Sequence, residues 1–207
     1  TAIEHNLTLV HISSDYVFDG VAEVHDEDEA FAPLGVYGQT KAAGDIAVAM
    51  APKHYILRSS WVIGDGHNFV KTMMALSDRV ANPDEALEQV TVVDDQIGRL
   101  TFTQDMARAI FFLIDHEAPY GTHDLTSSGD SVSWATIARE VFAQANGNGQ
   151  AVKPISTEEY FANATAPVSP RPTHSTLDLA KIEETGFEPS DWRDELHAYV
   201  AAARQGE

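Results

Sequence analysis

The chain has 207 residues, of which 43% are hydrophobic, and it carries 32 acidic against 13 basic side chains for a formal net charge of −19. Such a charge argues strongly against a nucleic-acid partner, because neutralising phosphates needs a basic surface. The lack of cysteine excludes disulfides and thiolate chemistry, and neither a membrane-spanning apolar run nor a secretion leader is visible, so we expect a folded cytoplasmic protein that does not enter a membrane.

The first elements of the chain end in hydroxyl side chains. Residues Thr1–Asn6 resemble the frayed end of a helix, and the strand expected over Leu7–Ile12 runs into Ser13, Ser14 and Asp15. In an open α/β sheet, the carboxyl end of a strand presents side chains to a ligand. Ser14 is therefore a candidate catalytic hydroxyl; the alternative is a hydroxyl that only closes a turn with Asp15.

A tyrosine and a lysine follow at helical spacing. Tyr37 and Lys41 open an apolar run that continues to Met50, and positions i and i+4 of a helix share one face. A cation held beside a phenol favours the phenolate and lowers a pKa that is ordinarily near about 10. The pair is typical of a proton donor and acceptor that works at neutral pH.

The remaining elements alternate between strands and helices. In chain order they are a strand over His54–Val62, a helix over Asn68–Val80, a strand over Gln89–Val93, a helix over Thr103–Asp115, a strand over Thr122–Thr126, a helix from Ser133 to Ala145, a strand over Val152–Ile155 and two final helices. This alternation predicts an α/β protein with a largely parallel sheet.

Capping residues set the expected helix ends. Thr103, Ser133, Asp178 and Ser190 are the predicted N-caps, and Asp105 lies in a first turn, where an acid is favoured. Asn146-Gly147 stops one helix, Gly186 closes the next, and the last helix runs to about Ala203. The acidic stretch Glu23–Glu29 is expected to be a solvated loop.

Several sequence blocks stand out in order along the chain: His11–Gly20, Val36–Gly44, Arg58–Gly64, His67–Met73, Asp95–Gly98, Pro154–Tyr160, Arg171–Asp178 and Lys181–Phe187. Together they closely resemble the dTDP-4-dehydrorhamnose reductases, a family within the extended short-chain dehydrogenase/reductases. The resemblance implies that residues 1–66, rejoined by about 101–126, are the C-terminal half of a Rossmann-like parallel sheet. Residues 67–207 then form mainly a smaller α/β lobe that binds a nucleotide-sugar.

The same resemblance implies roles for individual residues. Tyr37 protonates the substrate alkoxide, Ser14 hydrogen-bonds the same oxygen, and Lys41 also holds the nicotinamide ribose. Tyr37 is also a candidate for contact with the cofactor. The further candidates are Ser13 and Ser60 for the cofactor, and Asp15, Trp61, Asn68, Arg99 and Arg171 for the substrate. Core filling is the alternative for Trp61, and an exposed position beside prolines is the alternative for Arg171.

The family opens with a glycine-rich turn that cradles the dinucleotide pyrophosphate, and no such turn occurs in this sequence. The glycine pairs 35/38, 64/66 and 147/149 are interpreted as turn glycines. We therefore expect a fragment that lacks the N-terminal half and is inactive alone. The implied cofactor is NADPH or NADH, with magnesium possible at a subunit contact. The implied partners are a dTDP-sugar, the missing half and a second subunit in a homodimer. The histidines show no spacing typical of a metal site built by the protein.

Two positions depart from the family pattern, and two rival functions remain open. Ser14 stands where threonine is common, which keeps the hydroxyl, and Leu100 stands where proline is expected, which relaxes a loop. A non-catalytic relative, such as the regulatory beta subunit of methionine adenosyltransferase, is one rival. A nucleotide-sugar epimerase or dehydratase is the other.

Overall fold

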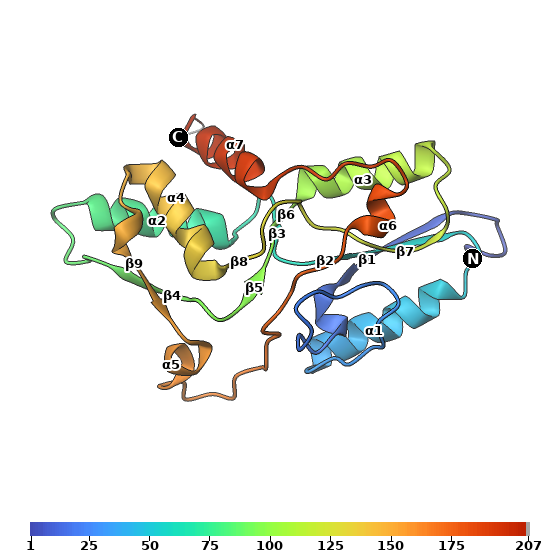
Figure 1. The fold of residues 1–207 in the computed structure, drawn as a ribbon, viewed down its shortest axis with the longest axis horizontal. Helices are drawn as coiled ribbons and strands as arrows, with labels where there is room; N and C mark the ends of the chain where they lie inside the picture. The colour runs from blue at the N-terminus through green and yellow to red at the C-terminus, as the bar shows by residue number, and fades with distance from the viewer. Residues whose placement is uncertain (206–207) are drawn as a thin grey trace.

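The computed structural model describes residues 1–205 and confirms an α/β fold (Figure 1). Three parallel strands, β1 (Leu9–Ser14), β2 (His54–Ser59) and β7 (Gly121–Asp124), form one sheet in the order β1-β2-β7. Helix α1 (Val36–Ala49) covers one face of this sheet, and α3 (Thr103–Asp115) covers the other with the short α6 (Ala180–Glu183). Parallel strands need such crossovers, so the carboxyl ends of β1 and β2 meet at one edge.

Helix α1 lies against the sheet through small side chains. Gly38, Ala42 and Asp45 are its buried residues and recur at helical spacing, while Ile46 and Met50 point outward and are exposed. Small side chains on the inner face let the helix backbone approach β1 and the loop that follows it. On the other face of the sheet, α3 buries the more usual apolar stripe of Met106, Ala109 and Leu113.

A second group of elements gathers around its own core. Strands β4 (Val90–Val93) and β9 (Val152–Ile155) pair in parallel beside α2 (Phe69–Ala81) and α4 (Trp134–Asn146). The largest buried side chains of this core include Phe142, which α4 contributes, and Trp192, which begins α7 (Trp192–Gln205).

Short elements join the two groups. Strand β3 (Val62–Ile63) pairs in parallel with β6 (Thr101–Phe102), and β5 (Ile97–Gly98) pairs in antiparallel fashion with β8 (Val132–Ser133). The remaining pieces are the 3-10 turns η1 (Asp15–Val17) and η2 (Gly149–Ala151) and the one-turn helix α5 (Thr157–Phe161).

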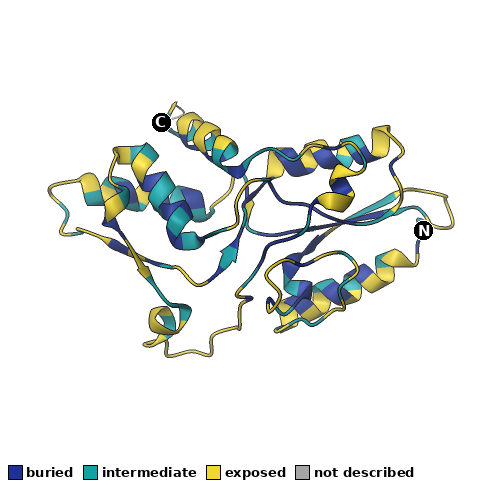
Figure 2. Cartoon of the chain, in the orientation of Figure 1, coloured by how far each residue is buried: buried dark blue, intermediate teal, exposed yellow. Residues whose placement is uncertain are grey.

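Burial follows the layers, with dark strands at the centre and exposed outer helix faces (Figure 2). Residues 162–171, between α5 and the return to the sheet, are exposed and form no regular element. Among residues 1–205, no helix has the length and apolar character that crossing a bilayer requires.

Several predicted helix ends are confirmed. Ser133 accepts a hydrogen bond from the amide of Thr136 at 3.1 Å and caps α4. Gly147 ends the same helix in the left-handed conformation, at φ 72°, which glycine adopts without strain. The N-cap predicted at Asp178 is wrong by one residue, because Leu179 takes the cap position of α6 without a side-chain bond, although Asp178 accepts from the amide of Ala180 at 2.7 Å.

Two further predicted caps are wrong. Thr103 is the first residue of α3, and Phe102 takes the cap position without a side-chain bond, because β6 runs directly into the helix. At the last helix Asp191, rather than Ser190, accepts from the amide of Arg193 at 2.8 Å. Ser190 instead donates its amide to the Asp105 carboxylate of α3 at 3.1 Å. Ser190, which the local sequence predicts as the cap, is therefore bonded to Asp105 of a distant helix instead.

The single strand expected over His54–Val62 is wrong, because the structure divides it. Strand β2 ends at Ser59, and Trp61 then adopts a left-handed backbone at φ 49° before β3 begins. Such a φ is unfavourable for a residue with a side chain, so it persists only where the surroundings hold it. The surroundings here are the aromatic stack described below.

The acidic stretch Glu23–Glu29 is only partly solvated. Glu27 accepts a hydrogen bond from the amide of Asp124 at 2.8 Å, and a carboxylate oxygen of Glu29 lies 2.7 Å from Nδ1 of the buried His25. The loop is therefore fixed to the carboxyl end of the sheet. Residues 1–6 form a hydrogen-bonded turn that ends with Asn6 in the left-handed region.

Candidate active site

The tyrosine and the lysine lie on α1, as the spacing predicts. The helix begins after Gly35, and Tyr37 remains 57% exposed at its first turn. The Lys41 ammonium donates to the backbone carbonyl of Ile12 in β1. One turn further along α1, Asp45 lies 3.5 Å from the His11 ring of β1. Burial, together with the nearby Lys41 charge, lowers the pKa of His11. Lys41 is thus held against the strand that carries Ser14, with Tyr37 on the adjacent turn.

Ser14 closes the turn at the end of β1. Its hydroxyl donates to Oδ1 of Asp15 at 2.9 Å and accepts from the amide of Tyr16 at 3.2 Å, which caps η1. Asp15 is 3% exposed, so the structure buries this predicted substrate ligand beneath Ser14. The neighbouring Ser13 hydroxyl is buried and forms no hydrogen bond with any residue in the range 1–205.

Tyr16 connects Tyr37 to a distant part of the chain, a role that its local sequence does not indicate. Its ring meets the Tyr37 ring edge-on, with centroids 5.6 Å apart. Its hydroxyl accepts from Nη1 of Arg171 at 3.3 Å. Burial raises the pKa of Tyr16, which keeps the phenol protonated. Gly38 permits this approach, because a Cβ at that position would lie 2.1 Å from the Tyr16 carbonyl oxygen.

Arg171 also borders a cavity of about 350 Å³ between α2, β4 and α5. The walls are largely apolar and aromatic, and they include Phe69, Val92, Trp134, Tyr160 and Phe161. A cavity of this size with few polar groups is typical of a small-molecule site. Arg171 is the one cationic side chain among the residues that line this cavity. It is linked to Tyr37 by its hydrogen bond to Tyr16 and by the contact between the two tyrosine rings.

Trp61 packs against Trp134, one of the residues that line this cavity. Its ring stacks on Trp134 at 3.8 Å between centroids, and Trp134 in turn packs on Phe69 at 4.5 Å. Gly98 lies beneath it, where a Cβ would come within 3.0 Å of the Trp61 ring. Trp61 is half-buried and packs against this core, which agrees with the core-filling alternative; its role as an aromatic wall for the sugar stays a prediction.

The other predicted site residues have structural contacts. Asn68 caps α2 through Lys71 and donates to the Gly64 carbonyl at 2.8 Å. The Ser60 hydroxyl donates to the carbonyl of Arg99 at 3.2 Å. The Arg99 guanidinium itself donates to the carbonyl of Leu177, and burial lowers its pKa. Their roles toward cofactor and substrate stay predictions.

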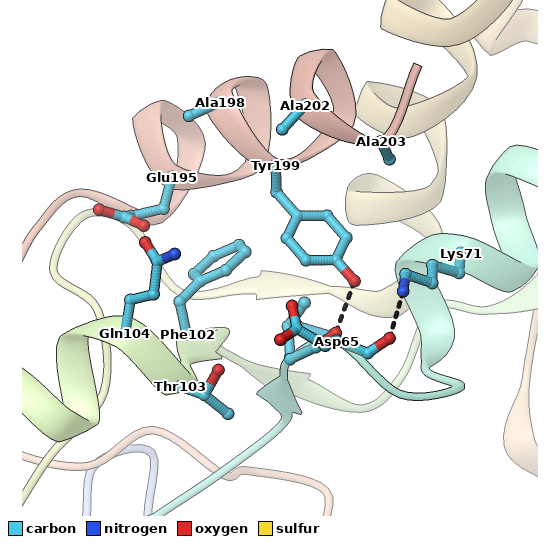
Figure 3. A pocket seen from close by; sticks show the side chains of 12 residues that line it. Asp65, Lys71, Phe102, Thr103, Gln104, Glu195, Ala198, Tyr199, Ala202 and Ala203 are labelled. Atoms are coloured by element: carbon cyan, nitrogen blue, oxygen red, sulfur yellow. Dashed lines mark hydrogen bonds between the residues drawn. The ribbon is translucent and has the colours of Figure 1, made fainter. Parts of the chain in front are cut away.

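A second cavity, of about 400 Å³, lies between α7, the start of α3 and the β3–α2 loop (Figure 3). Tyr199 points into it and donates to the Gly64 carbonyl at 2.6 Å, and Lys71 donates to the carbonyl of Asp65 (Figure 3). None of the predicted catalytic or binding residues lines this cavity, so the site around Tyr37 is the better candidate. Within residues 1–205, no group of three or more histidine or acidic side chains is arranged to hold a metal ion.

The carboxyl end of the sheet buries acidic groups. Burial, partly offset by the neighbouring hydroxyl groups of Ser175 and Ser14, raises the pKa of Asp15 to about 6. Burial and the neighbouring Glu27 raise the pKa of Asp124, at the end of β7, well above its usual range. Neither carboxyl oxygen of Asp124 has a hydrogen-bond partner among the described residues.

Stability is expected to fall from pH 5 to pH 8, and Asp124→Asn should flatten this slope. The folded protein keeps the Asp124 proton at a pH where the unfolded chain has released it. Stability is therefore lost as the pH rises above the unfolded value, by up to about 1.4 kcal/mol per pH unit for one group. Melting temperatures at pH 5, 6, 7 and 8 measure the slope. Asp130→Asn is the control, because Asp130 is 82% exposed; equal slopes in both variants would contradict the assignment.

Comparison with known proteins gives a consistent result. Residues 1–205 match the family model described as the RmlD substrate binding domain. The chain is 38% identical over 194 residues to the spore coat polysaccharide biosynthesis protein SpsK of Bacillus subtilis, covering 92% of this chain and 63% of that protein. It is 36% identical over 209 residues to a dTDP-4-dehydrorhamnose reductase of Aggregatibacter actinomycetemcomitans, covering 94% and 67%.

Solved structures agree. The crystal structure of dTDP-4-dehydrorhamnose reductase from Bacillus anthracis in complex with NADP superimposes with a TM-score of 0.82 at 35% identity, covering 97% of this chain and 67% of that one. The chain thus spans about two thirds of the length of these relatives.

Proposed function

Because the chain belongs to the family of the RmlD substrate binding domain, we propose that the whole protein reduces a dTDP-4-keto sugar with a nicotinamide cofactor. The specific reaction proposed is reduction of the C4 ketone of dTDP-4-dehydro-L-rhamnose to dTDP-L-rhamnose by NADPH or NADH. Two observations support the proposal. Lys41 on α1 donates to the Ile12 carbonyl of the strand that ends in Ser14. The Tyr37 ring contacts Tyr16, whose hydroxyl accepts from Arg171 at the border of the 350 Å³ cavity.

The residues present fit the nicotinamide end of such a cofactor. Lys41 lies at β1 with its ammonium bonded to a backbone carbonyl, and it retains donors for ribose hydroxyls. The buried Ser13 hydroxyl, without a partner among residues 1–205, is a second polar group available there. The 207 residues contain no glycine-rich phosphate-binding turn, so we propose the activity for the whole protein and expect none from the isolated chain.

Three side chains act in the proposed reduction of the ketone. The bound nicotinamide supplies a hydride to the ketone carbon. Tyr37 gives its phenolic proton to the oxygen, which becomes the hydroxyl of the product, and Ser14 stabilises the developing charge by a hydrogen bond. Tyr37 is then reprotonated from solvent, to which it is open, and Lys41 holds the nicotinamide ribose.

We place the nucleotide part of the substrate in the 350 Å³ cavity. Its aromatic walls suit a base, and Arg171 suits an anionic pyrophosphate because guanidinium groups bind phosphate oxygens in pairs. The net charge of −19 repels an anionic ligand, so a local cation is needed at the entrance.

Arg171→Ala is expected to raise the KM for the dTDP-sugar by about 10- to 100-fold with a smaller change in kcat. A charge-assisted hydrogen bond contributes about 1.5–3 kcal/mol, and here it acts on bound substrate and transition state alike. Steady-state kinetics of the full-length protein measure both constants. Arg139→Ala, on α4 away from the cavity, is the matched control. An unchanged KM in Arg171→Ala would remove Arg171 from the site.

The decisive experiment follows cofactor and product together. The full-length protein is mixed with NADPH and dTDP-4-dehydro-L-rhamnose, and one NADPH is expected to be consumed for each reduced sugar formed. An epimerase or dehydratase would change the sugar and return the cofactor. A non-catalytic relative would show no NADPH oxidation above background.

A further inference from the structure

The hydroxyl of Ser14 has a single proton, and in the structure this proton is donated to Asp15. Ser14 Oγ donates to Oδ1 of Asp15 at 2.9 Å and accepts from the Tyr16 amide at 3.2 Å. A serine hydroxyl has one donor and two acceptor positions. While its proton is directed at Asp15, Ser14 has no donor left for a substrate oxygen.

Asp15 is placed to change this arrangement. Its carboxyl group is 3% exposed, and Oδ2 forms no hydrogen bond with any residue that the structure describes. If Asp15 carries a proton, it can donate to Ser14 Oγ. Ser14 then accepts from Asp15 and from the Tyr16 amide, and its own proton is free to turn toward the site. No proton is consumed by this reversal, because Asp15 keeps the one it carries.

Building on the proposed function, we propose that Asp15 is a positioning residue for Ser14. The protonated carboxyl group of Asp15 directs the Ser14 hydroxyl proton toward the substrate ketone. The ionised carboxylate instead accepts that proton in a hydrogen bond and so turns it away from the ketone. Asp15 does not touch the reacting atoms. It acts through the hydrogen bond that it shares with Ser14.

The groups that face Asp15 allow it to titrate near neutrality. Burial raises the pKa of Asp15 to about 6, against the opposing effects of Ser175, Ser14 and His25. His25 is itself paired with Glu29, and the Tyr16 phenol next in the chain bonds Arg171. An anionic substrate and cofactor in the adjacent site would raise the pKa further, since like charges disfavour ionisation.

The kinetic test uses the full-length protein. In the wild type, kcat/KM is expected to fall as the pH rises above about 6, by up to tenfold per unit, because this constant reports groups of the free enzyme. Asp15→Asn supplies a permanently neutral side chain with an amide donor for Ser14, so this limb of the profile should disappear while activity remains. In a Ser14→Ala background, Asp15→Asn should have no further effect on kcat/KM.

A merely structural Asp15 gives a different result. Asp15→Asn would then change the melting temperature and leave the shape of the pH profile as in the wild type, which overturns the proposal. Complete lack of NADPH oxidation in the wild type would instead count against the proposed function, and the next measurement still decides the role of Asp15.

The second measurement needs no turnover. In protein labelled with ¹³C-aspartate, the Asp15 carboxyl is expected to titrate near pH 6, and Ser14→Ala should move its pKa upward, because the donor that favours the ionised form is lost. A carboxyl that titrates below about pH 4.5, and that Ser14→Ala leaves unmoved, would overturn the proposal whatever the protein catalyses.

Discussion

Tyr37→Phe is expected to lower kcat for ketone reduction by about 10²- to 10⁴-fold while leaving the melting temperature unchanged. The substitution removes the hydroxyl that we propose as the proton donor to the alkoxide, and general acid catalysis typically contributes this much. Stability should hold because Tyr37 is 57% exposed and its ring contact with Tyr16 survives. Initial rates of NADPH oxidation, with thermal unfolding of the same samples, measure both effects.

Tyr120→Phe is the matched control for this experiment. Tyr120 is 47% exposed, and among residues 1–205 its hydroxyl hydrogen-bonds only with Thr8, at 3.4 Å, near the opposite end of the sheet. Its loss should leave kcat within about twofold, since surface substitutions away from special features have small effects. A Tyr37→Phe enzyme that retains more than a tenth of the wild-type kcat would mean that another group protonates the product.

Asp45→Ala is expected to destabilise the protein by about 3–5 kcal/mol, or roughly 10 °C in melting temperature. Asp45 on α1 is 2% exposed and pairs with Arg58 of β2, which is 4% exposed, at 3.0 Å. The Arg58 guanidinium also lies against the rings of Phe18 and Phe31, at 5.2 and 5.1 Å from their centroids. Removing the carboxylate leaves this buried cation without its counter-ion. Calorimetric unfolding measures the loss.

Two further variants separate the buried charge from simple loss of packing. Arg79→Ala breaks an exposed pair with Glu85 and should cost less than about 1 kcal/mol. Adding Arg58→Met to Asp45→Ala removes the buried guanidinium that the first substitution leaves unpaired. The double variant is therefore expected to be more stable than Asp45→Ala alone. If the double variant is the less stable of the two, the damage comes from lost contacts and not from an unpaired charge.

Features that depend on neighbours in sequence could be predicted. The shared face of Tyr37 and Lys41, the Ser133 cap and the Gly147 stop each follow from helix geometry over one or two turns. The order of strands and helices follows from alternation in the same way. These elements also place Ser14 and Lys41 at the same end of the sheet.

Features that depend on distant partners could not be predicted. The local sequence predicts Ser190 as a helix cap, but its amide donates to the Asp105 carboxylate. It also predicts a solvated Glu27, but this carboxylate accepts from the amide of Asp124. Trp61 breaks a strand that its local sequence favours, because stacking on Trp134 holds its backbone. Tyr16 belongs to the candidate site through its contacts with Tyr37 and with the distant Arg171. Its position inside a recognisable block, two residues after Ser14, was the one available signal.

The bond between Tyr16 and Arg171 spans 155 residues. On the ribosome, at roughly 5–20 residues per second, the tyrosine therefore emerges on the order of ten seconds before the arginine that we propose for the substrate entrance. The proposed acid-base pair on α1 is thus synthesised well before the proposed anion-binding residue. The proposed catalyst thus remains unable to capture substrate until nearly all of this chain has been translated.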